Sequence, residues 1–166
     1  MSHTMKFPSA ERWVSSPLRN GIKIELNASV GEVWKVVINP ANIFSNCCGV
    51  NSVESKTNDS GKCTEYTINY ESEDGGDDMV ARSTMVWYEP GQGWASLDEE
   101  PHPMGFEQSL LLVTIEEKEE KAVLNWNMYY DIANDEMLQM FITGLEQSLN
   151  EEVAQLFIQK FGGRMI

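Results

Sequence analysis

Residues 22–37, IKIELNASVGEVWKVV, join a short strand directly to a capped helix. Apolar and charged residues alternate over 22–26, which indicates a strand with one buried face. Ser29 followed by Glu32 is the pattern of a capping box, in which each side chain satisfies a backbone N–H group at the start of a helix. The apolar residues after this cap recur at helical spacing and are Val30, Val33, Trp34 and Val37. The stretch therefore predicts a strand over about 21–27 and a helix that buries one face.

The next part of the chain predicts a short helix and then a series of strands. Asn39-Pro40 ends the first helix, because the residue before a proline avoids helical geometry. A second helix is expected over 41–45. Alternating apolar and polar residues, separated by glycine-containing or charged turns, then predict strands over 63–70, 79–89, 94–97, 106–116 and 122–131.

One long amphipathic helix is expected near the C-terminus, over about 135–160. Asn134 is a suitable N-cap, and Asp135 and Glu136 match the positive end of the helix dipole. A continuous apolar stripe follows, formed by Leu138, Phe141, Ile142, Leu145, Leu149, Val153, Leu156 and Phe157. The order of elements predicts an α+β fold in which a curved antiparallel sheet grips a terminal helix.

Composition limits the class of protein. The 166 residues suggest one domain over 21–166, preceded by an extension over 1–20. The formal net charge of −14 disfavours binding to nucleic acid or to an anionic membrane surface. No apolar run is long enough for membrane insertion, and no signal peptide is visible. We therefore expect a cytoplasmic, acidic protein, and the sequence leaves open whether it is a monomer or a homodimer.

Three segments resemble a known superfamily. Residues 24–34 are similar to its opening strand and helix, residues 85–90 to a strand followed by a proline turn, and residues 123–128 to its last strand. The superfamily is the START, Bet v 1-like and polyketide-cyclase group (SRPBCC), which includes the Aha1-type proteins. The resemblance implies the helix-grip fold, with two small helices after the first strand. It also implies an internal hydrophobic cavity between the sheet and the terminal helix.

The residues expected to line this cavity come from the strands and from the terminal helix. Strand alternation places the first six on one face, and spacing of four residues aligns the last three. The predicted ligand-binding residues are Tyr66, Ile68, Met85, Trp87, Trp126, Met128, Met137, Phe141 and Leu145. The predicted function is therefore the binding of a hydrophobic or amphipathic small molecule, such as a lipid, a polyketide or an aromatic metabolite.

No pattern predicts a catalytic, metal or cofactor site. His102 lies between prolines and is expected on the surface of a loop, while Glu65 and Arg82 fall on the solvated face of the sheet. Histidine clusters and spaced cysteine pairs, which bind zinc, are absent from the sequence. Two alternatives to a binding protein remain open. One is an enzyme similar to the polyketide cyclases or hydrolases, with His102, Glu65 or Arg82 as acid–base groups, and the other is an Aha1-type interaction module.

Overall fold

The computed structural model describes residues 7–47, 49–71 and 79–166, and it contains one sheet of eight antiparallel strands. The strands are β1 (Leu18–Leu26), β2 (Val50–Thr57), β3 (Cys63–Tyr70), β4 (Met79–Glu89), β5 (Gly93–Asp98), β6 (Glu107–Lys118), β7 (Lys121–Asp131) and β8 (Gly163–Met165). The helices are η1 (Ala10–Arg12), α1 (Val30–Val37), α2 (Ala41–Phe44), α3 (Asp135–Ser148), η2 (Leu149–Val153) and α4 (Ala154–Phe161). This is the predicted α+β architecture.

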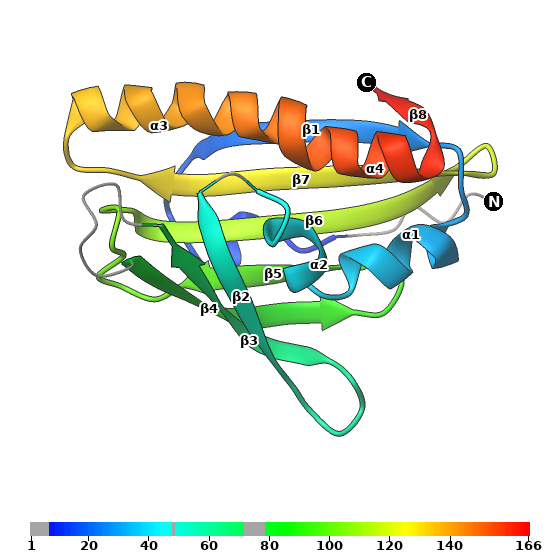
Figure 1. Ribbon diagram of the computed structural model, residues 1–166, viewed down its shortest axis with the longest axis horizontal. Coiled ribbons are helices and arrows are strands. Elements are labelled where there is room, and N and C mark those ends of the chain that lie inside the picture. Colours follow the sequence, from blue (N-terminus) through cyan, green and yellow to red (C-terminus); the bar gives the residue numbers. More distant parts are fainter. Residues whose placement is uncertain (1–6, 48, 72–78) are drawn as a thin grey trace.

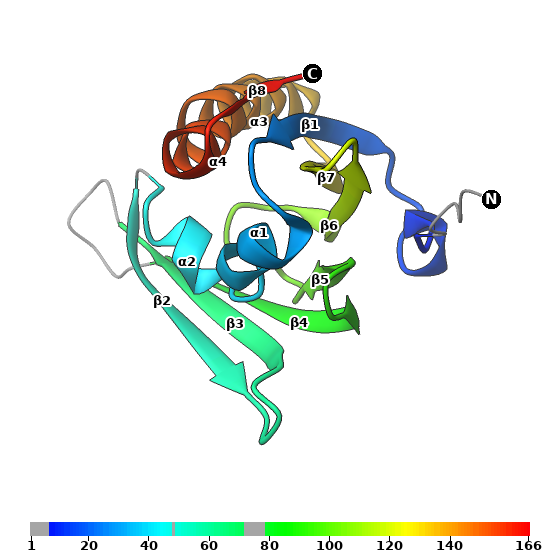
Figure 2. The ribbon, with the colours of Figure 1, turned by 90° about the vertical axis from the view of Figure 1, so that its right-hand side faces the viewer.

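The sheet has the order β2-β3-β4-β5-β6-β7-β1-β8 and curves around its helices. The terminal helix, formed by α3, η2 and α4 in succession, runs along the β7–β1 side of the sheet (Figure 1). The end-on view shows α1, α2 and α4 together on the inner side of the curve (Figure 2). We call this inner side the concave face and the opposite side the convex face.

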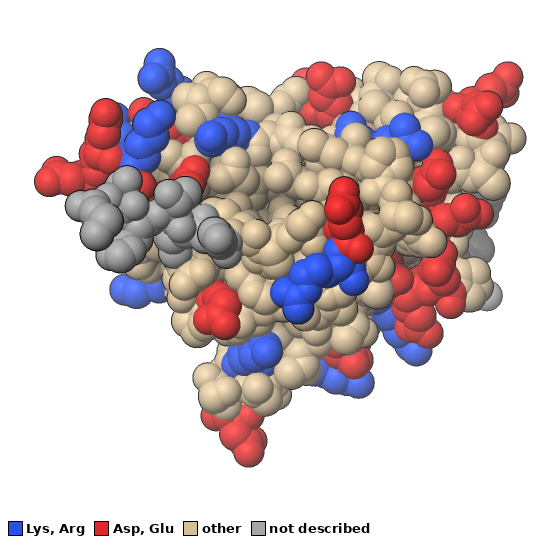
Figure 3. All heavy atoms as spheres, turned by 180° about the vertical axis from the view of Figure 1, so that it is seen from behind, with Lys and Arg blue, Asp and Glu red and all other residues tan. Residues whose placement is uncertain are grey.

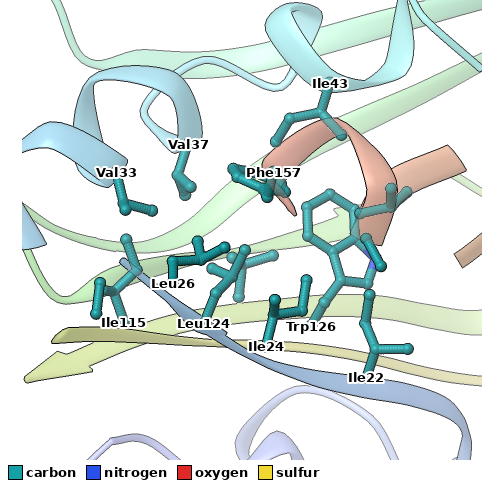
Figure 4. Packing of buried hydrophobic residues seen from close by; sticks show 14 of the residues in the cluster. Ile22, Ile24, Leu26, Val33, Val37, Ile43, Ile115, Leu124, Trp126 and Phe157 are labelled. Atoms are coloured by element: carbon teal, nitrogen blue, oxygen red, sulfur yellow. The ribbon is translucent and has the colours of Figure 1, made fainter. Parts of the chain in front are cut away.

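The core fills one end of the concave face. Ser29 caps α1 by accepting a hydrogen bond from the Glu32 amide, and the Glu32 carboxylate accepts one from the Ser29 amide. The predicted capping box is therefore present. It directs the fully buried Val33 and Val37 toward β1 and toward Phe157 of α4, where the side chains meet in a continuous apolar layer (Figure 4).

Three strand segments were not predicted. β2 contains only two apolar residues, Val50 and Val53, because an edge strand with two largely exposed faces has no strong alternation. β1 begins at Leu18, inside the expected extension, and β8 pairs three C-terminal residues with β1. The predicted acidic turn between β3 and β4 falls mostly on residues 72–78, which lie outside the described residues.

The predicted terminal helix is continuous but not uniform. Five residues in its middle, η2, form a π-helical segment between α3 and α4. A π segment widens the helical turn and so changes which residues face inward on either side of it. Leu149 and Val153 of η2 are buried here, and they link the apolar stripe of α3 to the stripe of α4.

The convex face is partly covered by the segment that precedes β1. Ala10 and Val14 are buried against Ala95, Leu110 and Leu112 of β5 and β6. The Ser15 amide and hydroxyl donate hydrogen bonds to the Gln108 side-chain oxygen. We call residues 9–16 the N-terminal strap.

Candidate functional site

Beyond the solid core, the concave face carries a first aromatic cluster. Phe44 of α2 stacks on Tyr66 of β3, with ring centroids 5.7 Å apart, and meets the edge of Trp126 of β7 at 5.7 Å. Trp94 of β5 contacts both Tyr66 and Trp126. The indole N–H group of Trp94 donates to the Val37 carbonyl oxygen over 2.8 Å, which anchors the cluster to α1.

A second aromatic cluster lies beneath the first half of α3. Phe106 contacts the rings of His102, Tyr130 and Phe141, with centroids 4.8 to 4.9 Å apart. Met128 packs against this cluster and also against the core that contains Trp126. Met128 therefore lies between the two aromatic clusters, and it keeps partial exposure to solvent.

Polar side chains gather on the same face, on β3 to β6 and the loop after β5. We call this group the polar cluster: Tyr66, Ser83, Ser96, Asp98, His102 and Ser109. The hydroxyl groups of Tyr66 and Ser96 are hydrogen-bonded over 2.7 Å, and the Ser83 hydroxyl donates to the Asp98 carboxylate over 2.5 Å. Ser109 donates a further hydrogen bond to Asp98.

Asp98 and His102 form the titratable centre of the polar cluster. The His102 Nε2 atom is 3.9 Å from an Asp98 carboxylate oxygen. The His102 Nδ1 atom accepts a hydrogen bond from the Met104 amide over 3.1 Å, so the proton of the neutral ring is on Nε2, facing Asp98.

Burial shifts the pKa values of this pair in opposite directions. Desolvation raises the pKa of Asp98 against the hydrogen bonds from Ser109 and Ser83, and it lowers the pKa of His102 against the charge of Asp98. Burial, followed by the nearby Asp98 charge, also raises the pKa of Tyr66 above its usual range. The phenol therefore stays protonated, and burial disfavours the charged forms of both Asp98 and His102.

The buried polar atoms of the polar cluster all have hydrogen-bond partners, but the Asp98 carboxylate can accept a further hydrogen bond. Every buried side-chain nitrogen or oxygen in the described residues has a hydrogen-bond partner. An ionised carboxylate, however, has about four acceptor positions. Ser83 and Ser109 occupy two of those on Asp98, whose side chain is 21% exposed. Asp98 thus keeps unoccupied acceptor positions and a side chain that is only partly exposed.

The structure brings seven of the nine predicted ligand-binding residues to the concave face. Tyr66, Ile68 and Met85 share a cluster with Phe44, and Trp126 lies in the core beside them. Phe141, Leu145 and Met128 meet around the second aromatic cluster. Tyr66 and Trp126 are almost fully buried by other protein atoms, while Met85, Met128, Phe141 and Leu145 remain partly exposed.

Two of the nine lie elsewhere. The predicted common face of Met85 and Trp87 is wrong, because a β-bulge between them turns Trp87 to the convex face, where it packs near the N-terminal strap. Met137 is 41% exposed. The first turn of α3 buries Leu138 instead, so Met137 lies beside the inward stripe rather than on it.

The expectation for His102 is also wrong. Its side chain is 4% exposed and packs on Phe106, although its loop carries prolines on both sides. Glu65 and Arg82 do lie on the solvated face, where Glu65 pairs with Lys56 over 2.9 Å and Arg82 is exposed. These two residues are therefore remote from the concave face.

One signal in the sequence pointed to part of the polar cluster. Trp94, Ser96 and Asp98 alternate along β5, so a buried Trp94 places the other two on its own face. His102 gave no such signal, because its burial depends on Phe106 packing under α3, a contact between segments distant in the chain.

The described part of the chain has neither a metal-binding cluster nor a helix able to span a membrane. It contains no group of three or more histidine, cysteine, aspartate or glutamate side chains placed to hold a metal ion. Nor do the described helices include one with the length and apolar character needed to cross a bilayer.

Comparison with solved structures identifies the fold. A START superfamily protein from Mycobacterium smegmatis superposes with a TM-score of 0.57 at 12% identity, over 82% of this chain and 97% of that one. The protein has the helix-grip fold of the START and Bet v 1-like superfamily. The predicted resemblance is thus confirmed at the level of the fold.

Two further helix-grip structures show how widely the likeness extends. Ara h 8.0201 matches with a TM-score of 0.59 at 7% identity, over 84% of this chain and 97% of that one. The di-domain ARO/CYC StfQ from the steffimycin biosynthetic pathway matches with a TM-score of 0.62 at 12% identity, over 85% of this chain and 50% of StfQ. No family model matches the sequence, and no curated protein matches it either.

Proposed function

We propose that the protein binds an amphipathic small molecule on the concave face, between the two aromatic clusters. The ligand is a lipid, a polyketide or an aromatic metabolite. The observation that carries the proposal is the position of Asp98: an accessible carboxylate in a polar cluster, bordered by apolar side chains that are only partly buried.

The apolar part of the ligand would contact Met85, Met128, Phe141 and Leu145. These side chains are partly exposed, although they pack against the buried clusters of the concave face. Burying such surface contributes about 25 cal/mol per Å² before ordering costs are subtracted. Methionine side chains adapt their shape readily, so they suit a ligand with a flexible or planar apolar body.

The polar part would donate a hydrogen bond to Asp98. A hydroxyl group fits this role, since the carboxylate already accepts from two serine hydroxyls. A hydrogen bond to a charged group contributes about 1.5–3 kcal/mol. The site should therefore prefer an alcohol over the corresponding methyl ether, which keeps the shape but lacks the donor.

The first test is native mass spectrometry of the purified protein, followed by a Nile red displacement screen with fatty acids, sterols and aromatic alcohols. Dodecanol should displace the dye at a concentration roughly tenfold lower than dodecyl methyl ether does. The Asp98→Asn variant should lose this preference, and Glu99→Gln, which changes an exposed neighbouring carboxylate, should keep it.

A space-filling variant tests the location. Met128→Trp adds a large side chain between the aromatic clusters and should abolish dye binding while circular dichroism shows an unchanged fold. Met140→Trp is the matched control, because Met140 is 73% exposed on α3. Equal binding by both variants, or no binding by any compound class, would refute the proposal.

A cyclase- or hydrolase-like activity on the same ligand is the second candidate. It is favoured by the Asp98–His102 pair, which joins an acidic and a basic group beside the proposed site. Glu65 and Arg82 do not support it, since both lie on the other face. Incubation of any retained ligand with wild-type protein and with His102→Gln distinguishes the two functions: conversion by wild type alone indicates an enzyme, and unchanged ligand indicates a binding protein.

A further inference from the structure

A hollow lies on the outer surface of the molecule, between α1, α2 and α4. Its volume is about 500 Å³, and it is lined by Glu32, Lys35, Val36, Asn42, Asn46, Leu156 and Lys160. Figure 2 looks toward this end, with α4 on one side of α1 and α2. We call it the lysine pocket. A volume of this size is typical of sites for small organic molecules.

The lysine pocket is separate from the proposed concave site. The side chains beneath it are the core of the molecule, where Val33, Val37 and Phe157 are fully buried and meet the residues of β1 (Figure 4). A ligand in the lysine pocket therefore does not extend to Met128 or Asp98 through this layer.

Four of the described cations are held in ion pairs, and the two of the lysine pocket belong to the remainder, with Arg12, Lys23, Lys62, Arg82 and Lys118. Lys56, Lys121, Arg19 and Arg164 each form an ion pair with a carboxylate. By contrast, the structure gives Lys35 and Lys160 no ion pair with any described residue. Each lies in the last turn of its helix, where the helix dipole favours a cation without a neighbouring carboxylate.

The one carboxylate in the lining offsets only one of the two positive charges. Glu32 accepts a hydrogen bond from the Ser29 amide, which ties it to the start of α1. The lining therefore carries two cations against one committed anion, in a protein whose formal net charge is −14. A local excess of positive charge in such a protein marks a position where an anion is attracted rather than repelled.

The remaining lining residues define the rest of the ligand. Val36 and Leu156 supply apolar surface and are partly exposed. The side-chain amides of Asn42 and Asn46 donate to the backbone carbonyls of Val36 and Asn42, which fixes both side chains at the edge of α2. A matching molecule has an anionic group, a short apolar arm and no need of a metal.

We propose that the lysine pocket binds a small organic anion, a carboxylate or phosphate monoester with a short apolar chain, held between Lys35 and Lys160. This site is independent of the proposed concave site. Both groups carry negative charge on oxygen, which is what a lysine side chain binds. The titration described next distinguishes a carboxylate from a phosphate.

The experiment is a titration of ¹⁵N-labelled protein with octanoate, octyl phosphate, octanol and inorganic phosphate, followed by amide chemical shifts. Octanoate or octyl phosphate should shift the amides of Val36, Asn42, Asn46 and Leu156. Octanol, which lacks the charge, and inorganic phosphate, which lacks the apolar arm, should bind more weakly. The tighter of the two octyl anions identifies the preferred group.

Variants test the role of the two lysines. Lys35→Gln and Lys160→Gln should each weaken octyl anion binding roughly twofold to fivefold, as expected for exposed ion pairs. Lys118→Gln removes the same charge from the exposed end of β6 and should leave the affinity unchanged. Binding should also weaken as salt is added.

Three results would overturn the proposal. The first is octanol binding as tightly as the anions, and the second is a loss of affinity in Lys118→Gln equal to that in the pocket variants. The third is a set of shifts confined to the concave face, around Tyr66 and Met128, which would support the proposed function and exclude the lysine pocket.

Discussion

The imidazole of His102 is held on three sides: by the Met104 amide on Nδ1, by Asp98 facing Nε2 and by the ring of Phe106. This environment favours the neutral ring, because burial penalises the charged form more than Asp98 compensates it. Asp98 responds to the same burial in the opposite sense, with a raised pKa. The pair thus makes stability depend on pH through two terms of opposite sign.

The His102 term predicts a loss of stability on acidification. As pH falls below the unfolded-state pKa of about 6.5, the unfolded chain takes up a proton that the folded state resists. The Asp98 term has the opposite sign. Its stabilising contribution is lost as pH rises from the unfolded-state pKa of about 4 through the raised pKa of the folded state. In His102→Gln, the free energy of unfolding should therefore fall less between pH 7.5 and 5.5 than in wild type. Urea unfolding at both pH values measures this, and identical pH dependence in the two proteins would contradict it.

For single residues, the sequence predicts the position of a side chain better on a regular strand than in a loop or at a bulge. Tyr66, Met85 and Trp126 alternate as expected, so their face follows from strand geometry. Trp87 was misplaced because of a bulge, and His102 because its ring packs on Phe106, which in turn contacts the distant Phe141 of α3. Neither feature has a local pattern in the chain.

Among the elements, β5 makes an unusually close approach to β6 at its first residue. Gly93 has φ of +153°, and a Cβ atom there would lie 2.2 Å from the Val113 carbonyl oxygen of the paired strand. The tight turn after Pro90 and the buried Trp94 both depend on this approach.

Alanine at this position should therefore be strongly destabilising. Gly93→Ala is expected to cost at least about 2 kcal/mol in the free energy of unfolding, since either strand must move. Gly144→Ala is the matched change: it lies inside α3 with no atom within 4 Å of the added Cβ. It should stabilise by roughly 0.5–1 kcal/mol, because alanine favours helices more than glycine does. Chemical denaturation of both variants tests the contrast, which would fail if Gly93→Ala were neutral.

The elements themselves were predictable where the chain supplies caps and strong periodicity. The capping box at Ser29 and the stripe on α3 located both helices, and these give the order that defines the fold. β2 was missed because its sequence is largely polar on both faces, and η2 was missed because no residue pattern in 149–153 distinguishes a π-helical turn from an α-helical one. Such edges and irregularities come from pairing and packing rather than from local preference.

The whole molecule buries its two faces in different ways. The concave face is covered by its helices, whereas the middle of the convex face is covered by the N-terminal strap alone among the described residues. Seen from behind the view of Figure 1, residues other than Lys, Arg, Asp and Glu form broad areas between charged side chains of both signs (Figure 3). Release of the strap would expose a patch that includes Ala95, Leu110 and Leu112.

Val14→Asp should release the strap, because a lone carboxylate at a position that is 6% exposed is costly. We expect a lower melting temperature and self-association through the convex face, measured by sedimentation velocity. Ser9→Asp adds the same charge at an exposed position of the strap and should change neither property. The net charge of −14 opposes association, but at 0.15 M salt charges are screened beyond roughly 8 Å, while burial of apolar surface is not. Association of the Val14→Asp variant should therefore strengthen with added salt, and a monomer at every salt concentration would show that the strap does not protect this face.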